Sequence, residues 1–143
     1  MAATTDTIHA SCVAIKGRAV LITGASGSGK SDLALRLIDR GAALVSDDYT
    51  AIEVTPEGLK AMPPPTIAGK IEVRGVGIVD LPHTSEAPVA LYASLDAAVV
   101  RLPEPKAAYS LLGIDVPMIA VDAREASAPI KIELALARTE ATA

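Results

Sequence analysis

Aromatic residues are scarce in this chain of 143 residues: they make up 2% of it, and tryptophan and phenylalanine are absent. A core without those two residues must be built from Ala, Val, Leu and Ile, and 50% of all residues are hydrophobic, so burial is well supplied. The scarcity argues against the aromatic platforms on which single-stranded nucleic acids stack. Cys12 is the one cysteine, which excludes an internal disulfide and a four-cysteine zinc site.

Net positive charge and long apolar runs are also missing. The formal net charge is -4 at pH 7, so the chain has no basic footprint for nucleic acid or an anionic membrane. Residues 1–6 have neither the basic nor the apolar region of a signal peptide, and no apolar run approaches the length of a membrane span. We therefore expect a cytoplasmic protein without nucleic acid or membrane partners. The length suits one domain, which we place at residues 8–143 after a disordered segment of residues 1–7.

The strongest positive signal is a glycine-rich loop of the pattern G-x-x-x-x-G-K-[ST], the P-loop of nucleotide-binding proteins. It lies between a predicted buried strand, residues 19–23, and a predicted helix, residues 32–40. In this setting backbone amides surround phosphate oxygens, and the helix N-terminus adds partial positive charge. Lys30 would reach the β- and γ-phosphates and Ser31 would hold Mg²⁺, so we expect ATP and Mg²⁺ as ligands. The predicted cofactor-binding residues are Gly24, Ala25, Ser26, Gly27, Ser28, Gly29, Lys30 and Ser31.

The rest of the chain predicts an α/β fold in which a P-loop-containing mixed sheet carries flanking helices and hairpins. We expect the helix after the P-loop to end at Gly41, which suits the position after a helix C-terminus. Residues 127–138 are ambiguous, because their apolar residues alternate as in a strand while Ser127 and the alanines favour a helix; we favour the helix. Further strands are predicted over residues 8–15, 42–46, 95–102 and 117–121, and a hairpin joins residues 51–54 to 59–62.

Acidic residues follow the next predicted strand. Asp47 and Asp48 end the strand of residues 42–46, and if that strand lies beside the P-loop strand, both come near the phosphates. One carboxylate would orient Mg²⁺ or its water shell, and the other would accept a proton from an incoming hydroxyl; a simple Asx turn is the alternative. Glu72 lies near two glycines and is a candidate metal ligand. His9 opens a strand that pairs with the P-loop strand, where it either contacts the phosphate region or is a tolerated surface residue.

The order and spacing of these segments resemble the catalytic domain of HPr kinase/phosphorylase. The segment from Glu72 to Val79 carries most weight, because P-loops occur in many families and this segment does not. The match runs from about residue 8 to residue 138 and is closer before Leu81 than after it. We therefore expect a short form that contains the kinase domain without a separate N-terminal domain. The matching segments are Ile8–His9, Gly24–Ser31, Leu44–Asp48 and Glu72–Val79.

The resemblance implies a bacterial enzyme that uses ATP to phosphorylate a seryl hydroxyl of HPr, a small phosphocarrier protein. It gives Asp48 the role of general base toward that serine. Family members assemble as hexamers, and many also run the reverse phosphorolysis, in which phosphate attacks phosphoserine and pyrophosphate forms. The candidate site residues are then His9, Lys30 and Asp48 for catalysis and Ser31, Asp47 and Glu72 for the metal.

Two segments depart from the family pattern. Leu111 stands where members carry an arginine, and residues 121–126 replace a segment that is usually more basic, with Arg124 as its cation. Both regions are tied to the dephosphorylating reaction and to partner contacts, so we expect the kinase direction to be the better preserved. Two other functions share the phosphate loop and the acidic pair: a P-loop NTPase or small-molecule kinase, and a nucleotide-binding module without transfer activity.

Overall fold

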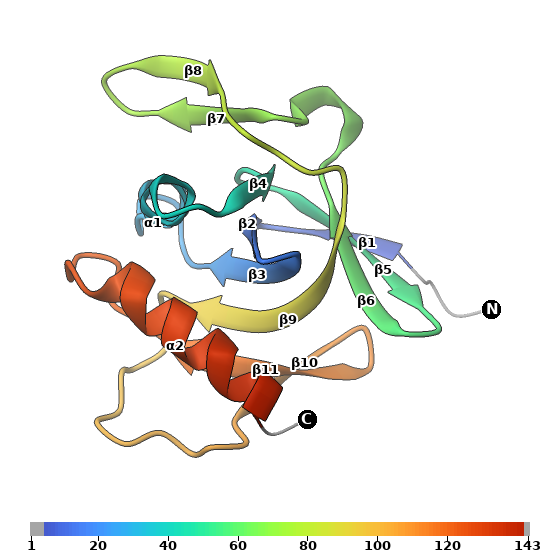
Figure 1. The fold of residues 1–143 in the computed structure, drawn as a ribbon, viewed down its shortest axis with the longest axis vertical. Coiled ribbons are helices and arrows are strands. Elements are labelled where there is room, and N and C mark those ends of the chain that lie inside the picture. Colours follow the sequence, from blue (N-terminus) through green and yellow to red (C-terminus); the bar gives the residue numbers. More distant parts are fainter. Residues whose placement is uncertain (1–4, 142–143) are drawn as a thin grey trace.

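A strongly curled sheet forms the centre of the computed structural model, which describes residues 5–141 (Figure 1). Within these residues the sheet has nine strands, and a two-stranded hairpin stands apart from it. The sheet strands are β1 (Thr5–Ile8), β2 (Ala10–Ile15), β3 (Arg18–Thr23), β4 (Ala43–Ser46), β5 (Thr50–Thr55), β6 (Gly58–Met62), β9 (Ala87–Ser94), β10 (Ala108–Leu111) and β11 (Ile114–Ala120). The hairpin is β7 (Lys70–Val73) and β8 (Gly77–Asp80), and the helices are α1 (Lys30–Asp39), α2 (Ala128–Ala141) and a short 3₁₀ helix, η1 (Pro65–Ile67).

Strand β3, which leads into the P-loop, lies in the middle of the sheet. On one side it pairs antiparallel with β2, which in turn pairs antiparallel with β4. On the other side it pairs parallel with β9, whose second half pairs parallel with β11. Strands β3, β4, β9 and β11 therefore run in one direction, and their carboxyl ends meet at one edge, where open α/β sheets bind ligands. The predicted α/β class with a mixed sheet is confirmed.

Each face of the sheet carries its own hydrophobic core. The core on the helix side contains Ile22 of β3, Leu37 of α1 and Ile132 of α2. The opposite core, which the curled sheet encloses, contains Leu21 of β3 together with Cys12. Successive residues of β3 thus serve opposite faces, as the pleat of a strand requires. Burial raises the pKa of the Cys12 thiol, so this side chain fills space and is not a ready nucleophile.

Helix α1 ends in a Schellman motif at the glycine that the sequence predicted. The amide of Gly41 donates to the carbonyl oxygen of Ile38 at 3.0 Å, and the amide of Ala42 donates to that of Leu37 at 3.1 Å. These are the two hydrogen bonds that define the motif. Gly41 has a φ of 112°, in the left-handed region that glycine adopts without steric cost.

The ambiguous segment of residues 127–138 is helical. The carbonyl of Ser127 accepts the first helical hydrogen bond, from the amide of Lys131 at 2.9 Å, so Ser127 is the N-cap residue. The apolar residues that alternate in the sequence divide between the two faces of α2, the buried ones being Ile132 and Leu136 and the exposed ones Ile130 and Leu134. No helix within residues 5–141 is long and apolar enough to cross a membrane.

The strand predicted over residues 95–102 is wrong. This segment is a loop, and the strand that was missed, β9, comes directly before it. The hydroxyl of Ser94 accepts hydrogen bonds from the amides of Asp96 and Ala97 at 3.3 and 3.0 Å, which turns the chain away from the sheet. The apolar residues that follow, which suggested a strand, therefore lie in an exposed loop.

The strand predicted over residues 8–15 is divided at His9, and residues 5–7 are not disordered. Strand β1 pairs with β5, whereas β2 pairs with β3 and β4, so the chain changes partners at the histidine. Pairing with β5 orders residues 5–7. Residues 1–4, the remainder of the segment predicted to be disordered, lie outside the described residues.

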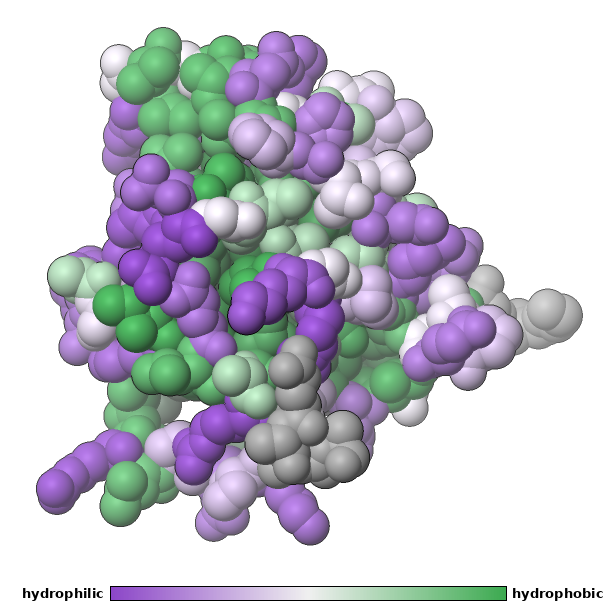
Figure 2. Space-filling view, in the orientation of Figure 1, coloured by the Kyte–Doolittle hydropathy of each residue, from purple (hydrophilic) through white to green (hydrophobic). Residues whose placement is uncertain are grey.

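The β7–β8 hairpin stands beyond α1 and β4 (Figure 1). Its Ile71 is buried in the helix-side core, which anchors the hairpin to the domain. Val76 and Ile78 are 74% and 73% exposed, and Figure 2 shows hydrophobic residues gathered at this end of the molecule. The hairpin therefore turns Ile71 inward, with Val73 and Val79 packed against the same core, and presents Val76 and Ile78 on its surface.

Replacing Gly41 by alanine should destabilise the protein by about 1–2 kcal/mol, because an L-residue pays that cost in the left-handed region. No atom lies within 4 Å of the added Cβ, so the effect would be conformational rather than steric. Urea unfolding measures it. Gly41→Asn is the matched control, since asparagine tolerates this region and should recover most of the loss; equal stability of Gly41→Ala and the parent chain would contradict the assignment.

Candidate active site

The glycine-rich loop of residues 24–29 joins β3 directly to α1. Gly27 and Gly29 have φ values of 82° and 100°, and Gly29 is the N-cap of α1. The amide of Ser28 donates to the carbonyl of Ala25 at 3.0 Å, which closes the loop into a tight turn. The backbone amides of the first helical turn have no intrahelical acceptors, so they are available to an anion at the helix N-terminus.

One buried polar group of this loop lacks a protein partner within residues 5–141. The hydroxyl of Ser28 is buried and has no hydrogen-bond partner among the described residues, so an oxyanion acceptor would satisfy it. A Cβ on Gly24 would lie 2.5 Å from that hydroxyl oxygen, which explains why the first loop position needs glycine. The loop is therefore packed closely around the Ser28 side chain.

The ammonium group of Lys30 lies across the loop. Lys30 is 5% exposed, and its Nζ donates to the carbonyl oxygens of Gly24 at 2.9 Å and Ala25 at 3.2 Å. Within the described part of the chain these neutral carbonyls, and not a carboxylate, hold the buried cation. A buried charge without a counter-ion favours an anionic ligand strongly, so the lysine suits a phosphate in the loop.

Asp47 is the acidic residue that contacts the loop. It is 8% exposed, and its Oδ1 accepts hydrogen bonds from the hydroxyls of Ser31 at 2.5 Å and Ser11 at 3.1 Å. Its Oδ2 accepts the backbone amide of Glu72 at 3.2 Å. The carboxylate therefore links α1, β2 and the β7–β8 hairpin, and it lies beside the hydroxyl predicted to hold Mg²⁺.

Asp48 faces the surface next to this buried group. Its φ is 67°, and its amide donates to the Ser11 hydroxyl at 3.1 Å. Its side chain is 53% exposed and its Oδ1 lies 2.7 Å from Nε2 of His9. The ring of Tyr49 lies against that histidine, with centroids 5.2 Å apart. The structure thus brings His9 and Asp48 together, two residues that are 39 positions apart in the sequence.

Ser11 was not predicted, although it connects the two acids. Its hydroxyl donates to Asp47 and accepts from the amide of Asp48, and the residue is 0% exposed. The available signal was one buried polar residue in an otherwise apolar strand. Its significance depends on β4, which is distant in sequence, so the strand pattern alone could not reveal it.

The strand order that was used to predict the position of Asp47 and Asp48 differs from the observed order. The prediction that the acids lie near the phosphates took β4 to be directly beside the P-loop strand as its condition, but β2 lies between β3 and β4. Because β2 is antiparallel to both β3 and β4, strand β4 runs in the same direction as β3. The carboxyl end of β4 therefore still lies at the edge of the sheet that carries the loop. The pair of acids is therefore close to the P-loop through Ser31, and Ser11 of the intervening strand takes part.

Glu72 meets the site through its backbone. Its amide binds Asp47, while its side chain is exposed, so a role as metal ligand stays a prediction. Among the described residues no three His, Cys, Asp or Glu side chains form a metal-binding group. The oxygen donors that the structure does bring together are the Ser31 hydroxyl and the Asp47 carboxylate, which suit Mg²⁺ when substrate phosphates and water complete its shell.

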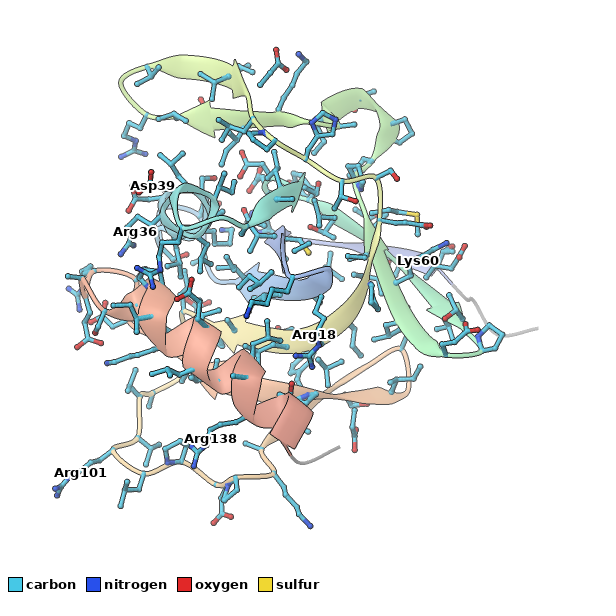
Figure 3. All side chains as sticks on the ribbon, in the orientation of Figure 1. Arg18, Arg36, Asp39, Lys60, Arg101 and Arg138 are labelled. Carbon is cyan, nitrogen blue, oxygen red and sulfur yellow. The ribbon has the colours of Figure 1, made fainter. Side chains whose placement is uncertain are left out.

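Arg36 connects α1 to the loop that precedes α2. Its guanidinium donates to the carbonyl of Ala123 and, at 3.1 Å, to that of Glu125, and Figure 3 shows it on the side of α1 that this loop passes. A Cβ on Gly29 would lie 3.1 Å from Cβ of Ala123. The loop before α2 is therefore packed against the phosphate loop.

The sequence of this chain matches the model of the HPr Serine kinase C-terminal domain over residues 1–141. It belongs to this family. The likeness extends to three dimensions: the solved structure of the Hpr(Ser) kinase/phosphatase from Coxiella burnetii superposes with a TM-score of 0.83 at 31% identity, covering 96% of this chain and 92% of that one. The resemblance noted in the sequence is confirmed.

Curated members of the family are longer proteins. The HPr kinase/phosphorylase of Clostridium novyi (strain NT) is 36% identical over 129 residues, which cover 87% of this chain and 42% of that protein. The HPr kinase/phosphorylase of Brevibacillus brevis is 40% identical over 116 residues, which cover 79% of this chain and 37% of that protein. The matched part of the chain thus covers less than half the length of these relatives.

Removal of the Ser11 hydroxyl should lower stability. Ser11→Ala deletes a donor to the buried Asp47 carboxylate, and a hydrogen bond to a charged group contributes about 1.5–3 kcal/mol. Urea unfolding measures the loss. Ser11→Thr keeps the hydroxyl and is the matched control. If both variants unfold at the same urea concentration, the hydroxyl does not stabilise the acidic pair.

Proposed function

We propose that this chain is an ATP-dependent protein-serine kinase that phosphorylates a seryl hydroxyl of an HPr-type phosphocarrier protein. One observation carries the proposal: a continuous hydrogen-bonded path runs from Ser31 at the end of the P-loop through Asp47 and Ser11 to Asp48. The path links the end of the P-loop to the backbone of Asp48, whose exposed carboxylate can act as a base. The names of the relatives, HPr kinase/phosphorylase, support the same substrate.

ATP would place its phosphates in the loop of residues 24–29. The amides at the start of α1, the Ser28 hydroxyl and the Lys30 ammonium are donors without a competing anion, so they would neutralise the charge of the β- and γ-phosphates. Ser31 and Asp47 would hold Mg²⁺, which supplies positive charge to the transferring phosphoryl group.

Asp48 would accept the proton of the attacking serine. Its carboxylate is held by His9 at 2.7 Å, and its backbone is held by Ser11, so its position is set from two sides. The side chains of His9 and Asp48 are 38% and 53% exposed. An open base of this kind can be reached by a serine on the surface of another protein, whereas a small-molecule kinase needs an enclosed acceptor site to exclude water.

The same loop and acids would also serve a P-loop NTPase or a small-molecule kinase. In an NTPase, Asp48 would orient water, and labelled phosphate from ATP would appear free instead of on protein. A module without transfer activity would bind ATP and release no label. The exposure of Asp48 and the family membership favour the protein kinase.

The proposal also covers the direction of the reaction, the oligomeric state of the protein and its location in the cell. Leu111, which replaces the family arginine, is 8% exposed and part of the second core, so no cation is supplied there and we propose the kinase direction rather than phosphorolysis. The homohexamer implied by the family resemblance and a cytoplasmic location, where ATP is available, complete the proposal.

Asp48→Asn should lower the rate of seryl phosphorylation by about 10²–10⁴-fold, because general-base catalysis typically contributes that much. ATP affinity should stay unchanged, since the carboxylate lies outside the loop. The gain of phosphate by a purified HPr-type carrier, followed by mass spectrometry, measures the rate. Asp80→Asn removes an exposed carboxylate paired with Lys70 and is the control. Full activity of Asp48→Asn would exclude Asp48 as the base.

Lys30→Met should weaken ATP binding about tenfold to a hundredfold, because a charge-assisted hydrogen bond to phosphate is lost from a buried position. Isothermal titration calorimetry in the presence of Mg²⁺ measures the affinity. Lys70→Met, at an exposed ion pair of the β7–β8 hairpin, should bind ATP like the parent chain. An unaltered affinity in Lys30→Met would mean that the loop does not bind phosphate.

A further inference from the structure

Three parallel strands end side by side at the edge that carries the phosphate loop. Strands β3, β9 and β11 are neighbours in the sheet, and each is followed by a loop at its carboxyl end. The acidic pair lies on the other side of β3, beyond β2. The loop of residues 24–29 therefore has the acidic pair on one side and the loops after β9 and β11 on the other side.

The loops on the second side form a pocket of about 370 Å³ that opens onto the phosphate loop. This volume lies within the range of small-molecule sites, about 300–1,000 Å³. Gly27 and Ser28 form one end of the pocket. The rest of the lining forms two walls. The first wall is Leu95, Ala97 and Val99 after β9, and the second wall is residues 121–124 after β11.

Both walls are fixed relative to the phosphate loop. The amide of Leu95 donates to the carbonyl of Thr23 at 2.8 Å, and that of Val121 donates to Ser94 at 3.0 Å. On the first wall, Asp96 accepts the amide of Ala25 at 3.3 Å. On the second wall, Arg36 donates to the carbonyls of Ala123 and Glu125, and Ala123 lies close to Gly29. These contacts hold the backbone of the second wall. The pocket is therefore a built part of the loop's surroundings.

The lining combines aliphatic side chains with a single carboxylate. Leu95, Ala97, Val99 and Val121 offer aliphatic surface, which suits the faces of a planar base. Asp122 adds the one carboxylate of the lining, and hydrogen bonds from Arg124 at 3.1 and 3.0 Å hold the pKa of Asp122 below its usual range. An ionised carboxylate accepts hydrogen bonds, and ribose hydroxyls donate them.

We propose that this pocket binds the nucleoside moiety of ATP, with the base against Val99 and the ribose hydroxyls toward Asp122. The inference rests on the proposed function, because it takes the phosphates to lie in the loop of residues 24–29. The nucleotide then crosses the carboxyl end of β3, with its base over β9 and β11 and its terminal phosphate toward Asp48. No residue of this pocket belongs to the acidic network, so the base and the acceptor serine approach from opposite sides.

Val99 permits a direct test, since it is 53% exposed and its neighbour Val100 is 60% exposed but is not part of the pocket lining. Figure 3 shows the next residue, Arg101, pointing outward from this loop. We would titrate the parent chain, Val99→Asn and Val100→Asn with ATP and with inorganic tripolyphosphate, each with Mg²⁺, by calorimetry. A thermal melt of each variant would verify folding.

Val99→Asn should weaken ATP binding about fivefold to tenfold, the effect of losing one apolar contact with the base, and should bind tripolyphosphate like the parent chain. Val100→Asn should match the parent chain with both ligands. Two results would overturn the inference and leave the proposed phosphate site intact. One is equal ATP affinity of the two variants, and the other is a parent chain that binds ATP no more tightly than tripolyphosphate. Failure of the parent chain to bind tripolyphosphate would instead overturn the proposed function, and this inference with it.

Discussion

The buried carboxylate of Asp47 is the interaction on which the rest of the site depends. A charge that is 8% exposed requires hydrogen-bond donors to offset its lost hydration, and three separate elements supply them. Ser31 lies in the first turn of α1, Ser11 comes from β2, and the amide of Glu72 comes from the β7–β8 hairpin. One group thereby links the start of α1, strand β2 and the β7–β8 hairpin.

The same carboxylate explains the different environments of two adjacent acids. Asp47 is turned inward, where its donors keep it beside the Ser31 hydroxyl. Asp48 adopts a left-handed φ of 67°, which directs its side chain to the surface and to His9. A pair that is alike in sequence is thus divided into a group suited to a metal and a group suited to proton transfer, and the division is made by backbone conformation and burial.

Local patterns predicted the local parts of the structure. The strand, glycine-rich loop and helix around residues 19–40, the glycine that ends α1 and the N-cap at Ser127 were predicted correctly, because each depends on a few consecutive residues. The placement of β2 between β3 and β4 and the hydrogen bonds of Ser11 to the two acids were missed, because both depend on pairing between segments far apart in the chain. The turn at Ser94 is local, and it was missed because the apolar residues that follow it suggested a strand. The resemblance to a family grouped His9, Asp48 and Glu72 into one predicted site, which periodicity could not do.

A crystal structure of this chain with Mg²⁺ and a non-hydrolysable ATP analogue tests the central claim most directly. The account predicts terminal phosphates against the amides of residues 24–31, and Mg²⁺ bound between those phosphates and the Ser31 hydroxyl, with Asp47 still holding that hydroxyl. Phosphates bound elsewhere, or Mg²⁺ held away from both Ser31 and Asp47, would contradict it.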